Sequence, residues 1–258
     1  SKENYRQQFV KFVDTIIQGG VLVYNNLDKE LESIALNCEK SIRKLEYSVP
    51  EHFIKNGITF LKTDEGDIPL SIFGEHNLNN LAGAKLICQL MGVHEQEFYN
   101  SISTFKGADR RLQAILKMED RNIYKDFAHS PSKVNATTKA LKKQFKDRKL
   151  IALLELHTFS SLNENFISEY CDTLKSADIA VVFYDPSVLI KKGIAEIDQQ
   201  KIKNAFNDNN LQVFSDSNKL KTFLLEQSYI NSNLLFMSSG NYASIDLNDL
   251  VNHIRKSK

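Results

Sequence analysis

The chain has 258 residues, of which 42% are hydrophobic and 25% charged, and its net charge is +1 at pH 7. These values are typical of a soluble globular protein with one large or two medium domains. They exclude a chain-wide field that would attract nucleic acid or an anionic membrane. No apolar run approaches the roughly 20 residues of a membrane-spanning helix, no signal peptide is recognised, and three scattered cysteines indicate reduced thiols. We therefore expect a cytoplasmic protein without nucleic-acid or membrane partners.

The first hundred residues combine helices, a buried strand and a hairpin. Apolar side chains recur at helical spacing over 3–18, and the run 21–24 is continuously apolar, as in a strand of a parallel sheet. Further expected elements are helices over 28–37, 77–91 and 94–104, and strands over 42–49, 58–62 and 68–73, with a turn at 63–67. Because only one strand is convincingly buried, we interpret residues 1–104 as the end of a larger α/β domain.

From about residue 105 the pattern becomes a regular alternation of strands and helices. We expect strands over 112–118, 122–126, 149–156, 178–184, 211–214 and 233–237, and helices over 131–145, 162–175, 197–207, 217–228 and 246–256. Continuously apolar strands that alternate with helices predict a mostly parallel, doubly wound sheet of Rossmann-like type. The fold class is therefore α/β, with a second domain over 105–258.

The start of the helix expected near residue 77 carries His76, Asn77 and Asn80. Asn77 and Asn80 are three residues apart, so they share one face of the first helical turn. A carboxamide both donates and accepts, which suits the N6/N7 edge of adenine. Asn is also a favoured capping residue, so the residues alone leave nucleotide binding and capping both open.

Two further motifs precede the next helix. Gly107 permits a turn, and the pair Arg110 and Arg111 can clamp phosphates, although a solvated basic turn is the commoner meaning of such a pair. Asp126 ends a strand at the edge where parallel sheets usually bind ligands, and its carboxylate can accept ribose hydroxyls. A strand end followed by a helix cap also explains Asp126, but it does not require His129.

The motif that begins at Glu155 ends another strand, so His157 and His129 are expected at the same edge of one sheet. The loop 238–242 reaches this edge as well. No His pair at i,i+4 and no cysteine set supports a metal site, so a polar substrate pocket is the favoured interpretation. No phosphate-binding loop of the Gly-x-x-x-x-Gly-Lys-[Ser/Thr] type occurs, so the main phosphate-binding residues are expected outside this chain.

Taken in order, these motifs resemble the Mur ligases of peptidoglycan synthesis. Residues 74–82 are similar to Gly-x-His-Asn-x-x-Asn-x-x-Ala, near the end of that family's ATPase domain, and 105–111 to Phe-x-Gly-x-x-Arg-Arg, which opens its C-terminal domain. Residues 126–132 resemble Asp-[Tyr/Phe]-[Gly/Ala]-His-His-Pro-Thr of the ligases that act on UDP-N-acetylmuramate. Residues 127–128 and 235–240 resemble the recycling branch, which joins L-alanyl-γ-D-glutamyl-meso-diaminopimelate to UDP-N-acetylmuramate. The L-alanine-adding ligase is the alternative.

The resemblance implies a mechanism and roles for individual residues. ATP phosphorylates the muramate carboxylate to an acyl phosphate, Mg²⁺ shields the phosphate charge, and the incoming amine attacks to form an amide, ADP and phosphate. Residues implied in ATP binding are His76, Asn77, Asn80, Arg111 and Asp126. Residues implied beside the amino acid or murein tripeptide are Phe127, His129 and His157, and Arg111 and His129 are implied in catalysis.

Departures from the family pattern qualify these expectations. Ser130 stands where a second His is usual, and Ser161 stands where the alanine-adding enzymes carry Arg, which puts simple recognition of the L-alanine carboxylate in doubt. The UDP-binding domain, the phosphate loop and the Mg²⁺ ligands of the family are missing. We therefore expect a fragment that is inactive alone, whose two halves contribute polar side chains to one cleft.

Two other functions stay open on the sequence, and the oligomeric state is not predicted. The first is a non-catalytic nucleotide-binding module with the same fold. The second is a folate-type glutamate ligase, which shares the architecture but against which the run from His129 to Pro131 argues.

Overall fold

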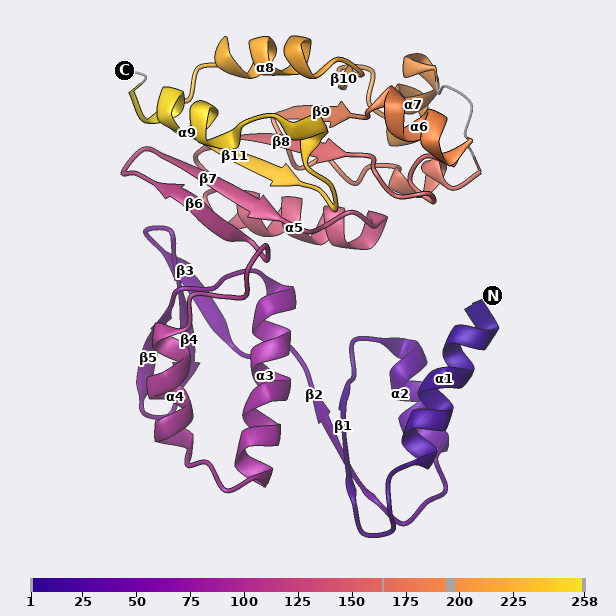
Figure 1. Cartoon of the computed structure of the whole chain (residues 1–258). Helices are drawn as coiled ribbons and strands as arrows, with labels where there is room; N and C mark the ends of the chain where they lie inside the picture. Colours follow the sequence, from indigo (N-terminus) through magenta and orange to yellow (C-terminus); the bar gives the residue numbers. More distant parts are fainter. Residues whose placement is uncertain (1, 164, 194–197, 257–258) are drawn as a thin grey trace. The chain divides into compact units, whose positions relative to one another are not determined.

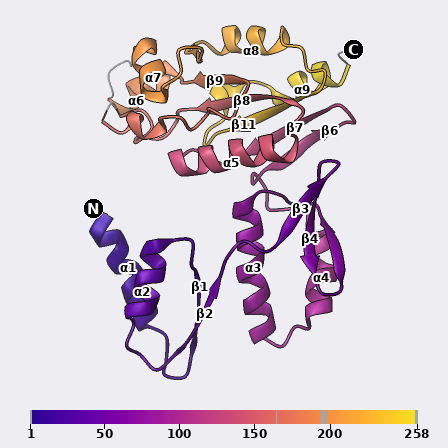
Figure 2. The same ribbon diagram turned by 180° about the vertical axis from the view of Figure 1, so that it is seen from behind.

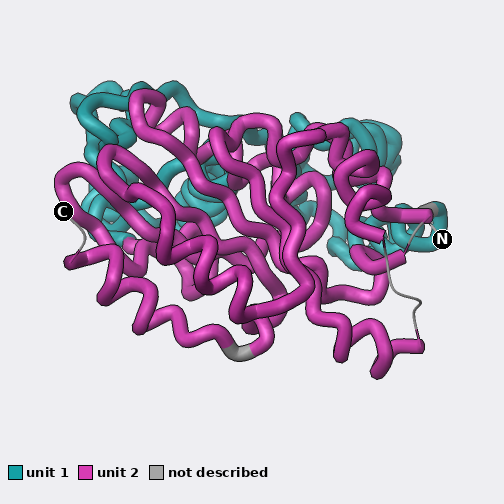
Figure 3. The backbone as a smooth tube through the Cα atoms, turned by 90° about the horizontal axis from the view of Figure 1, so that it is seen from above, with its two compact units in different colours: residues 1–105 teal, residues 106–258 magenta. Residues whose placement is uncertain are grey.

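The computed structural model describes residues 2–163, 165–193 and 198–256, and its elements are labelled in Figure 1. The chain divides into two compact units, unit 1 over residues 1–105 and unit 2 over residues 106–258 (Figure 3). None of the described helices is both long enough and apolar enough to cross a membrane. Each unit has its own core and is described by itself.

The first part of unit 1 is a βαβ arrangement with one added helix. Its elements are α1 (Lys2–Asp14), β1 (Val21–Asn25), α2 (Lys29–Asn37) and β2 (Arg43–Tyr47). β1 and β2 pair in parallel, so the predicted buried strand is confirmed as part of a parallel sheet. Asp28 caps α2 by accepting the N–H groups of Glu30 and Leu31. Residues Val13, Leu22, Ile34 and Ala35 form the core of this part.

The second part of unit 1 packs two helices on a small antiparallel sheet (Figure 2). Its elements are β3 (His52–Lys55), β4 (Ile58–Thr63), β5 (Gly66–Leu70), α3 (Glu75–Leu90) and α4 (Glu95–Thr104). The hairpin of β4 and β5 is confirmed. β3 was not predicted, although Asn56 and Gly57, both at positive φ, form the two-residue turn that joins it to β4.

Unit 2 is built on a six-stranded sheet in the order β10-β9-β8-β11-β7-β6. Its strands are β6 (Gln113–Lys117), β7 (Arg121–Asp126), β8 (Lys149–Glu155), β9 (Ile179–Phe183), β10 (Gln212–Phe214) and β11 (Ser232–Met237). All pairs are parallel except β6 with β7. The prediction of a mostly parallel α/β domain is therefore confirmed.

Helices cover both faces of this sheet. They are α5 (Pro131–Gln144), α6 (Pro186–Lys192), α7 (Gln199–Phe206), α8 (Ser217–Leu225) and α9 (Leu247–Lys256). Figures 1 and 2 show α5 on one face, and α8 with α9 on the other. β8 and β11 lie in the middle of the sheet and are almost entirely buried, because both of their faces are covered.

Two sequence predictions for unit 2 are wrong. The helix expected over 162–175 is a series of turns with one short 3-10 helix, Ile167–Tyr170. The side chain of Asn163 accepts the N–H of Asn165, and Asp172 has a φ of 58°, so local polar bonds and a left-handed residue interrupt the helix. α6 was missed, although Asp185 caps it and a Pro opens it. The start of the helix predicted from residue 197 lies outside the described residues.

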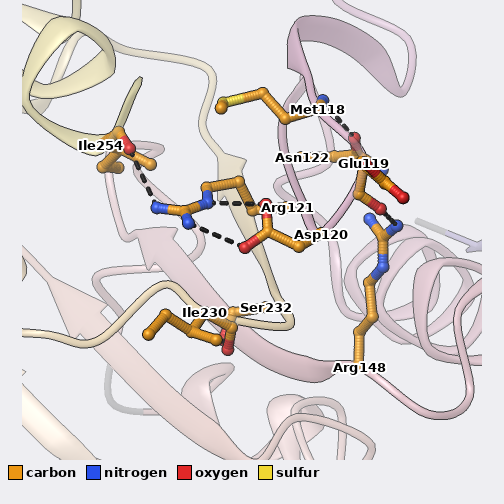
Figure 4. Close-up of polar contacts among 9 residues, drawn as sticks. All are labelled: Met118, Glu119, Asp120, Arg121, Asn122, Arg148, Ile230, Ser232 and Ile254. Atoms are coloured by element: carbon orange, nitrogen blue, oxygen red, sulfur yellow. Dashed lines mark hydrogen bonds and ion pairs between the residues drawn. The ribbon is translucent and has the colours of Figure 1, made fainter. Parts of the chain in front are cut away.

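The end of α9 is tied to the turn between β6 and β7 (Figure 4). The buried guanidinium of Arg121 forms an ion pair with Asp120 at 2.7 Å, and its Nη1 donates to the carbonyl of Ile254 at 3.2 Å. That carbonyl belongs to the last turn of α9, where carbonyls lack partners within the helix. Arg148 donates to the carbonyl of Glu119 in the same turn. Arg121 therefore fastens the last helix to the sheet, and Arg148 holds the turn beside it.

We predict that Arg121→Ala lowers the free energy of unfolding of unit 2 by roughly 1–3 kcal/mol, because the Ile254 carbonyl loses the guanidinium donor and Asp120 loses its ion-pair partner. Urea unfolding followed by circular dichroism measures this change, and amide exchange should quicken first in α9. Lys139→Ala, at an exposed position of α5, is the control. Equal losses in the two variants would contradict the role of Arg121.

This difference depends on pH. The hydrogen bond from Arg121 holds the pKa of the Asp120 carboxyl below its usual range. A carboxyl whose pKa is lower in the folded state stabilises that state at pH values above its pKa in the unfolded chain, which is about 4. This stabilisation is lost as the pH falls through the pKa of the folded state. The difference in free energy of unfolding between wild type and Arg121→Ala should therefore become smaller as the pH falls from 5 to 2. The decrease is expected to be on the order of 1 kcal/mol or less, because Asp120 is partly exposed.

Candidate active site

The carboxyl ends of β7, β11 and β8 lie next to one another at one edge of the sheet. The register aligns Met237 with Asp126 on one side and with Leu154 on the other. β7 leads to α5 on one face, whereas β11 leads to α9 on the opposite face (Figure 1). Ligands of open α/β sheets bind where neighbouring strands diverge in this way. The loops that follow these three strands therefore form the candidate site of unit 2.

Asp126 ends β7, and its carboxylate is 4% exposed. Its Oδ2 accepts the N–H of Leu112 at 2.7 Å, and its Oδ1 accepts the N–H of Ala128 at 2.6 Å. Arg110 and Leu112 both have positive φ, at 55° and 43°, which is rare for residues with a side chain. Asp126 thus holds a strained turn before β6 to the end of β7, and both of its oxygens have partners within the protein.

His129, Phe127 and Arg111 form one stack beside Asp126. The Nδ1 of His129 lies 2.8 Å from the carbonyl of Phe127. Because a carbonyl only accepts, this contact assigns the proton to Nδ1 and leaves a lone pair on Nε2 in the neutral ring. The rings of Phe127 and His129 meet edge to face at 5.1 Å, and the Arg111 guanidinium lies 5.7 Å from the Phe127 ring centre. The structure therefore brings together a cation, an aromatic ring and an imidazole acceptor.

Tyr170 is bonded to the group formed by Arg111, Phe127 and His129, and it was not singled out in the sequence. Its hydroxyl donates to the carbonyl of His129, and its ring stacks on Phe206 of α7. Burial raises the pKa of Tyr170 to about 12, so the hydroxyl stays a donor over the physiological range. Ser161 is 1% exposed, and its hydroxyl donates to the carbonyl of Thr158 at 3.0 Å. No sequence motif marks Tyr170, because its partner lies 41 residues away.

Glu155 at the end of β8 is the centre of a second polar group. Its Oε2 accepts the hydroxyl of Ser238 and, at 3.0 Å, the N–H of Tyr242. Its Oε1 lies 3.7 Å from Nδ1 of His157. The Ser238 hydroxyl also accepts the N–H of Gly240 at 2.6 Å. The sequence placed the motifs of both strands at this edge but did not single out Glu155, whose partner Tyr242 is 87 residues away.

The residues predicted to hold a nucleotide in unit 1 lie in the first two turns of α3. The Nδ2 of Asn77 donates to the carbonyl of Phe73 at 2.9 Å, so this side chain is bonded to the segment before α3 and does not cap the N–H groups of the helix start. Asn80 is exposed and His76 is half-buried. Asn79, which the sequence did not single out, is 9% exposed, and its Oδ1 has no partner among the described residues. A buried acceptor of this kind normally has a donor.

The described residues do not offer the ligand set that a magnesium ion needs. Among the residues that the structure describes, no group of three or more His, Cys, Asp and Glu side chains converges as metal ligands. Asp126 and Glu155 use their oxygens for N–H and O–H donors. The donor set therefore does not fit Mg²⁺, which takes oxygen ligands in an octahedral arrangement.

A mostly parallel sheet with convergent polar loops at its carboxyl edge defines a ligand-binding α/β domain. A family model described as "Mur ligase, glutamate ligase domain" matches residues 110–240, which cover this edge and 131 of the 258 residues. The chain belongs to the Mur ligase family.

Similar proteins agree with this membership. The chain is 26% identical over 254 residues to the UDP-N-acetylmuramate–L-alanine ligase of Agathobacter rectalis, a match that covers 93% of the chain and 55% of that protein. The UDP-N-acetylmuramate-alanine ligase of Thermotoga maritima has the same fold, with a TM-score of 0.68 and 14% identity over 100% of this chain and 56% of that one. The murein peptide ligase of Psychrobacter arcticus also has this fold, with a TM-score of 0.62 and 19% sequence identity. That match covers 98% of this chain and 55% of the other. The chain spans about half the length of these relatives.

We predict that Asp126→Asn destabilises unit 2 by roughly 1–3 kcal/mol, because the amide nitrogen faces one of the two N–H groups that the carboxylate accepts. Urea unfolding measures the loss, and amide exchange should quicken at Leu112 and Ala128. Asp109→Asn, at an exposed carboxylate nearby, serves as the control. Unchanged protection of both amides in Asp126→Asn would show that the carboxylate does not hold the turn.

Proposed function

We propose that this chain is the carboxyl-terminal part of an ATP-dependent ligase that joins an amine to the carboxylate of UDP-N-acetylmuramate in peptidoglycan synthesis or recycling. Membership of the Mur ligase family supports this proposal, as do the names of the similar proteins. In this proposal residues 1–104 complete the ATP-binding domain, and residues 105–258 are the C-terminal domain of the ligase. The setting is cytoplasmic, where nucleotide-linked precursors and ATP are available.

The observation that carries the proposal is the polar edge of unit 2, which offers groups of the kinds that amide formation needs. Arg111 supplies a fixed positive charge for phosphate oxygens. The Nε2 lone pair of His129 can accept a proton from the incoming ammonium group, whose electron pair then stays on nitrogen for attack on the activated carboxyl. Phe127 and His157 border the amine substrate. Asp126 acts by holding the turn that carries Arg111.

In unit 1 we propose that His76, Asn77 and Asn80 bind the adenine of ATP. The exposed carboxamide of Asn80 can donate and accept hydrogen bonds. So can the second N–H and the oxygen of the Asn77 carboxamide, because only one of its N–H groups is bonded to Phe73. Mg²⁺ and the phosphate loop belong, in this proposal, to parts of the ligase outside this chain, and the chain by itself is expected to be inactive.

For the amine substrate we propose the murein tripeptide L-alanyl-γ-D-glutamyl-meso-diaminopimelate. Ser161 is buried and bonded to Thr158, so position 161 presents no cation to the carboxylate of a single amino acid. L-Alanine is the second candidate, because the curated relatives carry the name UDP-N-acetylmuramate–L-alanine ligase.

The test uses the longest reading frame that contains this chain. Phosphate release from ATP in the presence of UDP-N-acetylmuramate is compared for the tripeptide and for L-alanine, and the amide product is identified by mass. We expect release with the tripeptide to exceed release with L-alanine by at least about tenfold, which corresponds to roughly 1.4 kcal/mol. Faster release with L-alanine would overturn the choice of amine, and no amide with either would favour a non-catalytic nucleotide-binding module.

We predict that Asn80→Ala in that protein weakens ATP binding by roughly 1–3 kcal/mol, or about 5- to 150-fold in Kd, because a carboxamide partner of the base is lost. Isothermal titration with ATP gives the Kd. Gln89→Ala, at an exposed position near the end of the same helix, is the matched control. If the two variants bind ATP equally, Asn80 has no part in nucleotide recognition.

A further inference from the structure

Glu155 is a buried carboxylate at the centre of the candidate site. It is 2% exposed, and burying a charged carboxylate is costly unless donors and a cation compensate it. The hydroxyl of Ser238 and the N–H of Tyr242 both point to Oε2. The imidazole of His157 is its neighbour on the other side, with Nδ1 3.7 Å from Oε1. The two oxygens thus face different groups, one the loop after β11 and the other the imidazole.

The loop that carries Ser238 also fixes the imidazole from a second side. A Cβ added at Gly240 would lie 2.7 Å from Nδ1 of His157 and 2.8 Å from Oε2 of Glu155. The ring therefore packs directly on the backbone of Gly240, at a distance that only a glycine allows. The next residues are held as well, because Tyr242, at a φ of 53°, is bonded through its N–H to Glu155 and through its hydroxyl to the carbonyl of Leu153. The imidazole lies between a fixed carboxylate and a fixed loop.

We propose that Glu155 is a positioning residue for His157 in the amide-forming reaction, an inference that rests on the proposed ligase function. The negative charge of the carboxylate, 3.7 Å from Nδ1, favours the tautomer of the neutral ring with its proton on Nδ1, which leaves the lone pair on Nε2. The side chain of His157 is 35% exposed, so a substrate can reach it. After His129 has taken one proton from the ammonium group and the amine has attacked the activated carboxyl, the nitrogen gives its second proton to Nε2 of His157. The N–H bond of the substrate breaks, its electron pair stays on nitrogen, and the imidazolium is stabilised by Glu155 until the proton passes to water.

Glu155→Gln separates this role from a purely structural one. The carbonyl oxygen of Gln can still accept from Ser238 and Tyr242, whereas its amide now turns N–H groups toward His157. We expect the tautomer of His157 to change from Nδ1–H to Nε2–H. The readout is the ¹⁵N NMR spectrum of the histidine side chains of this chain, which contains six histidines. His157→Gln identifies the resonances, and Glu226→Gln, an exposed position at the end of α8, is the control. Unchanged His157 resonances in Glu155→Gln would overturn the proposal.

Kinetics of the full-length ligase give the second readout. We expect Glu155→Gln to lower kcat roughly 100-fold, the scale of lost general-base catalysis, with little change in the KM values for ATP and UDP-N-acetylmuramate. In a His157→Ala background the same substitution should lower kcat no further, because Glu155 acts through His157. A further loss in that background, or an unchanged kcat in the single variant, would overturn the positioning role. If the wild-type protein forms no amide, the proposed function fails, whereas the NMR spectrum still decides whether Glu155 positions the ring.

Discussion

The parallel register of β7, β11 and β8 is the constraint on which the rest of unit 2 depends. A one-residue slip in either pair would turn every side chain of a strand to the opposite face. In the observed register the strands end together, so that Asp126, Glu155 and Ser238 meet within hydrogen-bonding range through their own atoms or through neighbouring backbone. The site is therefore set by main-chain pairing first and by side-chain chemistry second.

At this edge the carboxylates and the imidazoles have different tasks. Asp126 and Glu155 are buried. Both oxygens of Asp126 accept backbone N–H groups, and Oε2 of Glu155 accepts a backbone N–H and a hydroxyl, so these carboxylates hold the loops in place. His129 and His157 each direct Nδ1 to a neighbouring acceptor, a carbonyl in one case and a carboxylate in the other. The first contact is a hydrogen bond of 2.8 Å, whereas the second, at 3.7 Å, is an electrostatic contact only, so the two rings are held with different strength.

Much of the fold of unit 2 was predictable because buried parallel strands need continuous apolar runs. The strands expected over 149–156, 178–184 and 233–237 correspond to β8, β9 and β11. The insertion of β11 between β7 and β8 was not predictable, because it depends on pairing between segments about 80 and about 110 residues apart. The helix expected over 162–175 failed because Asn and Asp side chains compete locally with helical bonds.

For the site, strand ends in the sequence indicated where polar residues gather, but not what each side chain contacts. Asp126 was expected to face a nucleotide, and its actual partners are the N–H groups of Leu112 and Ala128. The hydrogen-bond partner of Tyr170 is the carbonyl of His129, 41 residues away, and a partner of Glu155 is the N–H of Tyr242, 87 residues away. Long-range hydrogen bonds of this kind leave no trace in local spacing. The roles of His76, Asn77 and Asn80 stay predictions.

The burial of Ser161 limits which side chains can stand at this position. Its hydroxyl closes a tight turn onto Thr158 in the loop that also carries Tyr170, the support of His129. An arginine introduced here would force a guanidinium into space that a hydroxymethyl group fills, and would disturb the imidazole through that support. An exchange at position 161 alone would therefore lower the stability of unit 2 unless the residues around Thr158 changed with it.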